Sequence, residues 1–138
     1  SQLDTASDYG AAVAMDFFSE ASDQLLPPAE PGERHFRLLL AVLEYLRQGI
    51  AEGRTNAVWP AVLYFSLWAV RLGGFLPELK VRPESLSVAE EMMRKPIGQL
   101  AERAWDKATA ADLRRYLIRR IEEHIERNLI TAPMLESL

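Results

Sequence analysis

The stretch Ala57-Val-Trp-Pro-Ala-Val-Leu-Tyr-Phe-Ser-Leu-Trp-Ala-Val-Arg-Leu72 is the most apolar part of the sequence. It is too short to cross a bilayer, and Pro60, Ser66 and Arg71 interrupt its apolar run. Proline is tolerated in the first turn of a helix, where its missing N–H leaves no hydrogen bond unmade. A helix that is apolar on all sides is usually buried, so we expect residues 57–72 to form the central helix of a bundle.

Two helices are expected before this stretch. Residues 8–25 carry apolar side chains at helical spacing, and Asp8 is suited to cap the first turn. Prolines between positions 27 and 31, followed by Gly32, force a break. Residues 33–48 have two apolar stripes, which predict a helix contacted on two sides. One stripe is Phe36, Leu39, Leu40, Leu43 and Leu46, and the other is Leu38, Val42 and Tyr45.

Further helices are expected after the central stretch. Gly73-Gly74 ends the central helix, and prolines keep residues 73–84 as a loop. Ser87 and Glu90 form the Ser-x-x-Glu pattern of a capping box, which predicts a helix that begins there. Pro96 then breaks or restarts that helix, because proline is rarely accommodated in a helix interior.

The last long helix is expected over residues 110–129, with Thr109 as its N-cap, and a short helix over residues 100–105 precedes it. One arc of its helical wheel is apolar, and Arg114 falls inside that arc. Such an arginine either extends its guanidinium outward or pairs with a buried acid. We expect the apolar arc to pack on the central helix. Its members are Leu113, Leu117, Ile118, Ile121, Ile125 and Leu129.

Length and patterning together indicate the fold class. The chain has 138 residues, about the size of one domain, and no segment shows the period-2 pattern of a strand. The sequence therefore predicts a single all-α domain over residues 1–138, a bundle of about five to seven helices. A polar and acidic N-terminal segment and the absence of cysteine lead us to expect no signal peptide and a cytoplasmic location.

Several classes of functional site are excluded by composition. With no cysteine and two histidines, the chain offers no thiolate metal site and no multi-histidine site. His35 and His124 are each interpreted as helix-surface or boundary residues, with no nucleophile placed beside them by sequence. No glycine-rich phosphate-binding motif is present. We therefore predict a protein that is not an enzyme and that uses no cofactor and no metal.

The arginines of the last helix are a candidate binding surface. The net charge of the chain is −4, so the protein as a whole does not attract polyanions strongly. Five arginines lie on this helix together with four acids, which leaves it a net charge of about +1 and favours a salt-bridged, solvated face. The segment from Arg114 to Arg120 is the basic patch to test. The five arginines are Arg114, Arg115, Arg119, Arg120 and Arg127, and the acids are Asp112, Glu122, Glu123 and Glu126.

An alternative function is the binding of a small apolar ligand or a regulatory role. Trp59, Trp68, Met92 and Met93 would then line an internal pocket. The helical spacing of Trp59, Phe65 and Trp68 favours ordinary core packing over a pocket.

Three stretches, read in order, carry a family resemblance: Phe65 to Leu79, Leu113 to Leu129 followed by Met134-Leu135, and more weakly Phe17 to Leu46. They resemble the C-terminal helical region of the RecO DNA-repair proteins. In that family a helix ending in a Leu-Gly-Tyr/Phe-x-Pro-x-Leu phrase precedes a final helix rich in Arg and Leu. The most specific match is Gly-Phe-Leu-Pro-Glu-Leu at residues 74–79.

The resemblance implies a non-enzymatic mediator of recombination. RecO-like proteins bind and anneal single strands, contact single-strand-binding protein, and work with RecR to load RecA. Their N-terminal OB-fold supplies much of the DNA contact, and no part of this sequence reads as that domain. The expected partners are the acidic tail of single-strand-binding protein, a RecR-like protein and single-stranded DNA, with no membrane involved. The acidic tail would bind a groove with an apolar floor and a basic rim. Candidate binding residues are Arg34, Arg37, Arg71, Arg114, Arg115, Arg119 and Arg120.

The sequence departs from the family pattern at three places. Many members carry a cysteine zinc site after the Pro-x-Leu phrase, whereas Lys80-Val81-Arg82-Pro83 follows it here, so zinc is not carried over. Tyr64 stands where members often have a basic residue that meets the acidic tail. Thr131-Ala132-Pro133 replaces a basic phrase after the last helix, which weakens the expectation that the tail binds DNA.

Overall fold

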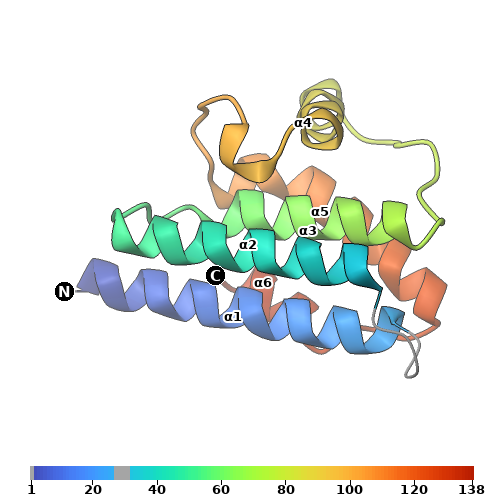
Figure 1. The fold of residues 1–138 in the computed structure, drawn as a ribbon, viewed down its shortest axis with the longest axis horizontal. Coiled ribbons are helices and arrows are strands. Elements are labelled where there is room, and N and C mark those ends of the chain that lie inside the picture. The colour runs from blue at the N-terminus through green and yellow to red at the C-terminus, as the bar shows by residue number, and fades with distance from the viewer. Residues whose placement is uncertain (1, 27–31) are drawn as a thin grey trace.

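The computed structural model describes residues 2–26 and 32–138, with side chains from residue 8 onward. The described residues form six α-helices and one 3-10 helix and contain no strand, which confirms the predicted all-α bundle (Figure 1). The proline break predicted within 27–31 lies outside the described residues. The helices are α1 (Gln2–Leu25), α2 (Glu33–Ala51), α3 (Val58–Leu72), α4 (Pro83–Arg94), η1 (Ile97–Gln99), α5 (Lys107–Ile125) and α6 (Ala132–Glu136).

Helix α3 is the centre of the bundle, as its apolar sequence predicts. It packs against α2 on one side and α5 on the other, and also contacts α1, α4 and η1. Figure 1 shows α1, α2 and α3 running side by side, with α4 seen end-on above α3. Pro60 lies in the first turn and is buried with its neighbours. Because neighbouring elements cover most of α3, most of its side chains are buried, and Arg71 near its end is exposed.

An aromatic cluster joins α1, α2 and α3. The ring of Phe65 on α3 lies 5.7 Å from that of Phe17 and 4.7 Å from that of Phe18, both on α1. His35 on α2 meets the same ring edge-on at 5.7 Å. The interpretation of His35 as a surface or boundary residue is therefore wrong, because α1 and α3 both cover the first turn of α2 on that side.

The stripe of α2 that begins at Phe36 is only partly buried. Leu38, Val42 and Leu46 are buried against the bundle, as expected for an amphipathic helix. Phe36 and Leu40, by contrast, are 57% and 52% exposed. Helix α2 contacts both α1 and α3, as the prediction of a helix contacted on two sides requires, but part of the stripe that begins at Phe36 stays exposed.

Three predicted helix starts also differ from the structure. Helix α1 begins at Gln2, so Asp8 lies in its interior. Helix α4 begins at Pro83, because proline is favourable at the first helical position, and Ser87 lies inside it. Helix α5 begins one residue after Asp106, whose carboxylate accepts a 2.7 Å hydrogen bond from the backbone N–H of Thr109. Thr109 is thus the third residue of the helix and completes the capping box.

Two segments expected to be helical are irregular. Residues 100–106 form no helix, and the turn after Pro96 is the short η1. Helix α5 ends at Ile125, because Glu126 takes a left-handed backbone conformation with φ of 58°. Leu129 is nevertheless buried, since the chain turns back onto α1. There Glu20 accepts hydrogen bonds from the backbone N–H groups of Ile130 (2.8 Å) and Thr131 (2.9 Å).

No helix in the described ranges has the length and apolar character needed to cross a membrane.

Candidate functional site

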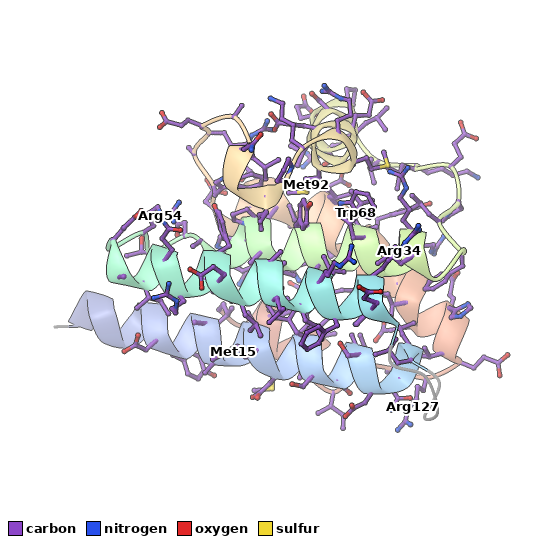
Figure 2. All side chains as sticks on the ribbon, in the orientation of Figure 1. Met15, Arg34, Arg54, Trp68, Met92 and Arg127 are labelled. Carbon is purple, nitrogen blue, oxygen red and sulfur yellow. The ribbon has the colours of Figure 1, made fainter. Side chains whose placement is uncertain are left out.

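An apolar groove with basic residues at its edge lies between α2 and α3. Its volume is about 320 Å³. Figure 2 shows Arg34 on α2 and Trp68 on α3 on the same side of the bundle. The amphipathic pattern of α2 explains the arrangement, because residues 34, 37, 38 and 41 lie on adjoining helical positions that border α3. The lining residues are Arg34, Arg37, Leu38, Ala41, Tyr64, Trp68 and Leu72.

A second hollow, of about 670 Å³, continues the first toward the end of α3. Arg34, Trp68 and Leu72 line both hollows, so we treat them together as the α2–α3 groove. Arg71 and His35 are added to the lining by the second hollow. The residues that line the combined groove come from the last two turns of α3 and the first two turns of α2.

Trp68 is held rigidly in this groove. Its indole N–H donates a 2.9 Å hydrogen bond to the backbone carbonyl of Met92 on α4. The guanidinium carbon of Arg71 lies 4.8 Å from the centre of the Trp68 ring, within the range of a cation–π contact. Tyr64 is the neighbouring aromatic residue, with ring centres 6.3 Å apart. A fixed aromatic surface costs little conformational entropy when a ligand binds.

The charges at the groove are mainly positive. Arg34, Arg37 and Arg71 are all exposed, and Glu33 is the acidic residue that lines the second hollow. Glu33 accepts a 2.6 Å hydrogen bond from Arg37, an exposed i,i+4 pair of the kind that contributes little. Burial raises the pKa of Tyr64, so its phenol stays neutral at pH 7. The groove therefore combines an uncharged apolar floor with a cationic edge.

Arg114 does not reach this groove. Its side chain is 1% exposed, its guanidinium carbon lies 5.7 Å from the Trp59 ring centre, and it donates a 3.2 Å hydrogen bond to Glu136 on α6. Arg114 therefore does not extend outward but forms an ion pair, and the acid it bonds is partly exposed rather than buried as predicted. Arg115 donates two hydrogen bonds to the same carboxylate, at 2.7 and 3.0 Å. These two arginines tie α6 to α5.

The remaining predicted residues lie on α5. Arg119 lines a separate groove with Lys80, Arg82 and Lys107. Arg120 donates a 2.7 Å hydrogen bond to Glu123 and lies over the Tyr116 ring. The seven candidate arginines thus divide among the α2–α3 groove, the α5–α6 contact and the surface of α5. Sequence analysis missed Lys80, Arg82 and Lys107, because no local pattern places them beside Arg119.

The four residues proposed for a small-ligand pocket are not brought together around one hollow. Trp59 and Met92 are packed in the core. Trp68 instead lines the surface groove described above. Core packing is the better account of Trp59 and Met92.

A buried serine–histidine pair lies between α1 and α2. Ser22 Oγ and His35 Nε2 share a 2.8 Å hydrogen bond, and both residues are buried. Within the described residues no carboxylate bonds to His35 and no group of acids and histidines could hold a metal ion. A Ser–His–Asp site needs such a carboxylate to orient the imidazole. The pair positions α1 against α2.

This pair makes stability depend on pH. Burial lowers the pKa of His35 below its ordinary value of 6.5, so the unfolded chain takes up the proton more readily. The contribution of neutral His35 to the free energy of unfolding is therefore fully present above about pH 7.5. It declines as the pH falls through 6.5, by at most about 1.4 kcal/mol per pH unit. Urea unfolding at pH 8 and pH 5.5 measures this decline. In His35→Gln, which keeps a hydrogen-bonding group, the decline should be smaller. An equal decline in that variant would contradict the assignment.

Comparison with known proteins places this geometry in context. The family model described as "Recombination protein O C terminal" matches residues 6–82, which include most of α1, all of α2 and α3, and the α2–α3 groove. A curated "DNA repair protein RecO" from Koribacter versatilis (strain Ellin345) is 34% identical over 165 aligned positions. The alignment covers 95% of this chain and 65% of the relative, so the chain spans somewhat less than two thirds of that protein's length. No solved structure matches the chain significantly.

Proposed function

Because this chain belongs to the RecO family, we propose that it has a role in DNA repair and recombination and that it works there as a binding unit rather than as an enzyme. We propose further that the α2–α3 groove binds the acidic C-terminal tail of single-strand-binding protein. The observation that supports this assignment is the meeting of Arg34, Arg37 and Arg71 around the groove that Trp68 lines.

The chemistry of the groove suits an acidic peptide that ends in phenylalanine. Trp68, Leu72 and Leu38 offer an apolar surface for the terminal aromatic ring. Arginine binds carboxylates in a planar, two-pronged geometry, so the exposed guanidinium groups can meet the acidic side chains and the terminal carboxylate. The basic residue that many relatives carry beside the equivalent of Phe65 is Tyr64 here, and Arg34 and Arg37 supply positive charge on the facing helix instead.

Reversing the charge at the groove should abolish most of this binding. In Arg34→Glu/Arg71→Glu, the affinity for a fluorescein-labelled acidic peptide ending in Phe should fall by at least about tenfold, because two attractive contacts become repulsive. Fluorescence anisotropy at low salt measures the change, and binding of the unaltered protein should weaken as salt rises.

A matched control is Arg47→Glu/Arg94→Glu, which changes the net charge equally at exposed positions outside the groove. This variant should keep its affinity within about twofold. A peptide whose terminal Phe is replaced by Ala should bind more weakly to the unaltered protein. No binding at low salt, or equal loss in both double variants, would refute the peptide site.

On the resemblance alone, we also propose a RecR-like partner and a role in handling single-stranded DNA in the cytoplasm. Neither is assigned to the α2–α3 groove.

A further inference from the structure

One face of α2 carries apolar side chains that the bundle leaves largely uncovered. Phe36 and Leu40 are each more than half exposed, and Leu43 is also on the surface. Arg47 follows them, and the steps between the four positions are four, three and four residues. That spacing places them in one line along the helix, which is the pattern by which one helix packs against another. We call these four residues the α2 seam.

Charged residues border the α2 seam on one side only. On the helical wheel Glu33, Arg37 and Glu44 lie beside the seam, on the side toward the α2–α3 groove. The other side of the seam, at Leu39 and Leu46, packs against the bundle. The seam is therefore an apolar line with the bundle on one flank and charges on the other.

These charges are available to a partner. Within the helix Glu33 pairs with Arg37 and Glu44 pairs with Arg47, and all four side chains are more than half exposed. Exposed pairs of this kind contribute little to stability, so exchanging them for pairs with another molecule costs little. Two acids and two arginines leave the surface with no net charge, which favours a partner of equally mixed charge.

The order of the charges is complementary to itself when the helix is reversed. Leu40 lies midway between Glu33 and Arg47, and within half a residue of the midpoint between Arg37 and Glu44. Two copies of α2 packed antiparallel about Leu40 therefore set each glutamate level with an arginine of the other copy. The same flank of each helix meets in such a pair, so both sets of charges lie on the meeting side. A parallel pair sets each charge level with its own like.

We propose that the α2 seam is the interface of a two-fold symmetric dimer, in which a second copy of this chain packs its α2 antiparallel on the first. In a two-fold dimer both copies use the same patch, which is what the self-complementary charges provide. Leu40 of each copy lies at the axis, with Phe36 and Leu43 on either side of it. Because the seam is short, the buried area is small and the association is weak, in the micromolar range.

The dimer leaves the α2–α3 groove open. Arg34 is two positions from Phe36 and leaves α2 on nearly the opposite side, while Trp68 and Arg71 belong to α3. The dimer therefore does not rest on the peptide proposal, and either can fail without the other. A dimer carries two such grooves, so a partner with several acidic tails would bind it by avidity.

Sedimentation equilibrium measures the association. The unaltered chain should pass from monomer to dimer over about 1–500 µM. Leu40→Glu should weaken the dimer by at least about tenfold, because it places two carboxylates at the axis. Circular dichroism should show an unchanged helical spectrum, since Leu40 is on the surface. Leu86→Glu, the same change at an exposed leucine of α4, should keep the association within about twofold.

An exchange of charges tests the antiparallel register. Arg37→Glu alone and Glu44→Arg alone each set like charges against one another across the axis, so each should weaken the dimer by at least about tenfold. An equimolar mixture of the two variants restores both ion pairs. It should form a heterodimer whose affinity is close to that of the unaltered dimer.

Introduced cysteines test the position of the axis, since the chain has none of its own. A disulfide needs Cα atoms less than about 7 Å apart. Under mild oxidation Leu40→Cys should therefore form a linked dimer. Arg47→Cys should not, because the two copies of this position are about 20 Å apart in the antiparallel pair. A parallel pair would link both variants.

Five results would overturn the proposal: a monomer across the whole concentration range, unchanged association in Leu40→Glu, equal loss in Leu86→Glu, a mixture of the two charge variants that stays monomeric, or linkage of Arg47→Cys as readily as of Leu40→Cys.

Discussion

Replacing Leu117 with aspartate should unfold the protein or nearly so. Leu117 is 0% exposed in the middle of α5, on the face that packs against α3. The substitution forfeits about 1.5–3 kcal/mol of apolar burial and places a carboxylate where nothing can pair with it, at a cost of several kcal/mol more. Since a protein of this size is typically stable by about 5–15 kcal/mol, the loss is comparable to the whole.

Urea unfolding followed by circular dichroism tests this prediction. We expect Leu117→Asp to lose its cooperative transition or to lose at least about 4 kcal/mol of unfolding free energy. Arg119→Asp, on the exposed side of the same helix, introduces the same residue and should cost about 1 kcal/mol or less. A cooperative transition in Leu117→Asp with a loss below about 2 kcal/mol would show that α5 does not pack on α3 as described.

Removing the carboxylate of Glu136 should destabilise the protein far more than removing the guanidinium of its buried partner, Arg114. Glu136 is bonded to the buried Arg114 and to the exposed Arg115. Glu136→Ala leaves the Arg114 guanidinium inside the protein without that acid, which costs about 3 kcal/mol. This value is at the low end of the cost of breaking a buried ion pair, because the Glu136 side chain is 39% exposed.

The reciprocal substitution, Arg114→Met, removes the buried charge and fills its space. Nε and Nη2 of Arg114 have no hydrogen-bond partner in the described structure, so few bonds are lost. Glu136 keeps its two hydrogen bonds from Arg115. We expect the free energy of unfolding of this variant to lie within about 1 kcal/mol of that of the unaltered protein. Apolar replacements of buried ion pairs are often neutral or stabilising. Equal destabilisation by Glu136→Ala and Arg114→Met would refute this asymmetry.

The contribution of the Glu136 carboxylate to stability is lost at acid pH. Hydrogen bonds from Arg115, and then from Arg114, outweigh burial and lower the pKa of Glu136 from 4.5 to about 2. A group with a depressed pKa stabilises the fold above its unfolded-state value and loses that contribution as pH falls. The contribution of Glu136 should therefore disappear between pH 4.5 and pH 2, and Glu136→Ala should show a shallower loss of stability over that range.

Local sequence patterns predict the helices correctly, but they do not predict the residues at which the helices begin. The periodicity of α1, α2 and α5 and the apolar run of α3 each depend on neighbouring residues, so they predict these elements correctly. Asp8, Ser87 and Thr109 were expected at N-caps and lie inside helices. Residues that cap helices are also tolerated within them, so the tertiary context selects which one is used.

Only part of the candidate site could be predicted from the sequence. Arg34, Arg37 and Arg71 were proposed at a groove edge, and the structure brings them together around Trp68. Trp68 was interpreted as a core residue, because a helical wheel does not show that its face ends at the surface beside α2. The resemblance to RecO proteins indicated the kind of groove to look for, but not which helices form it.

The amino-acid pattern alone predicts that this protein is helical and that residues 57–72 lie at its centre. An all-apolar helix in water has no stable place except inside a bundle. The surroundings of the basic residues, by contrast, depend on how distant segments pack together. That packing buries Arg114, bonds Arg115 to α6, and brings Lys80 to the same groove as Lys107, 27 positions along the chain. The reason is physical: periodicity specifies the direction in which a side chain leaves its helix, but packing between distant segments decides whether that direction meets solvent, an acid or another cation.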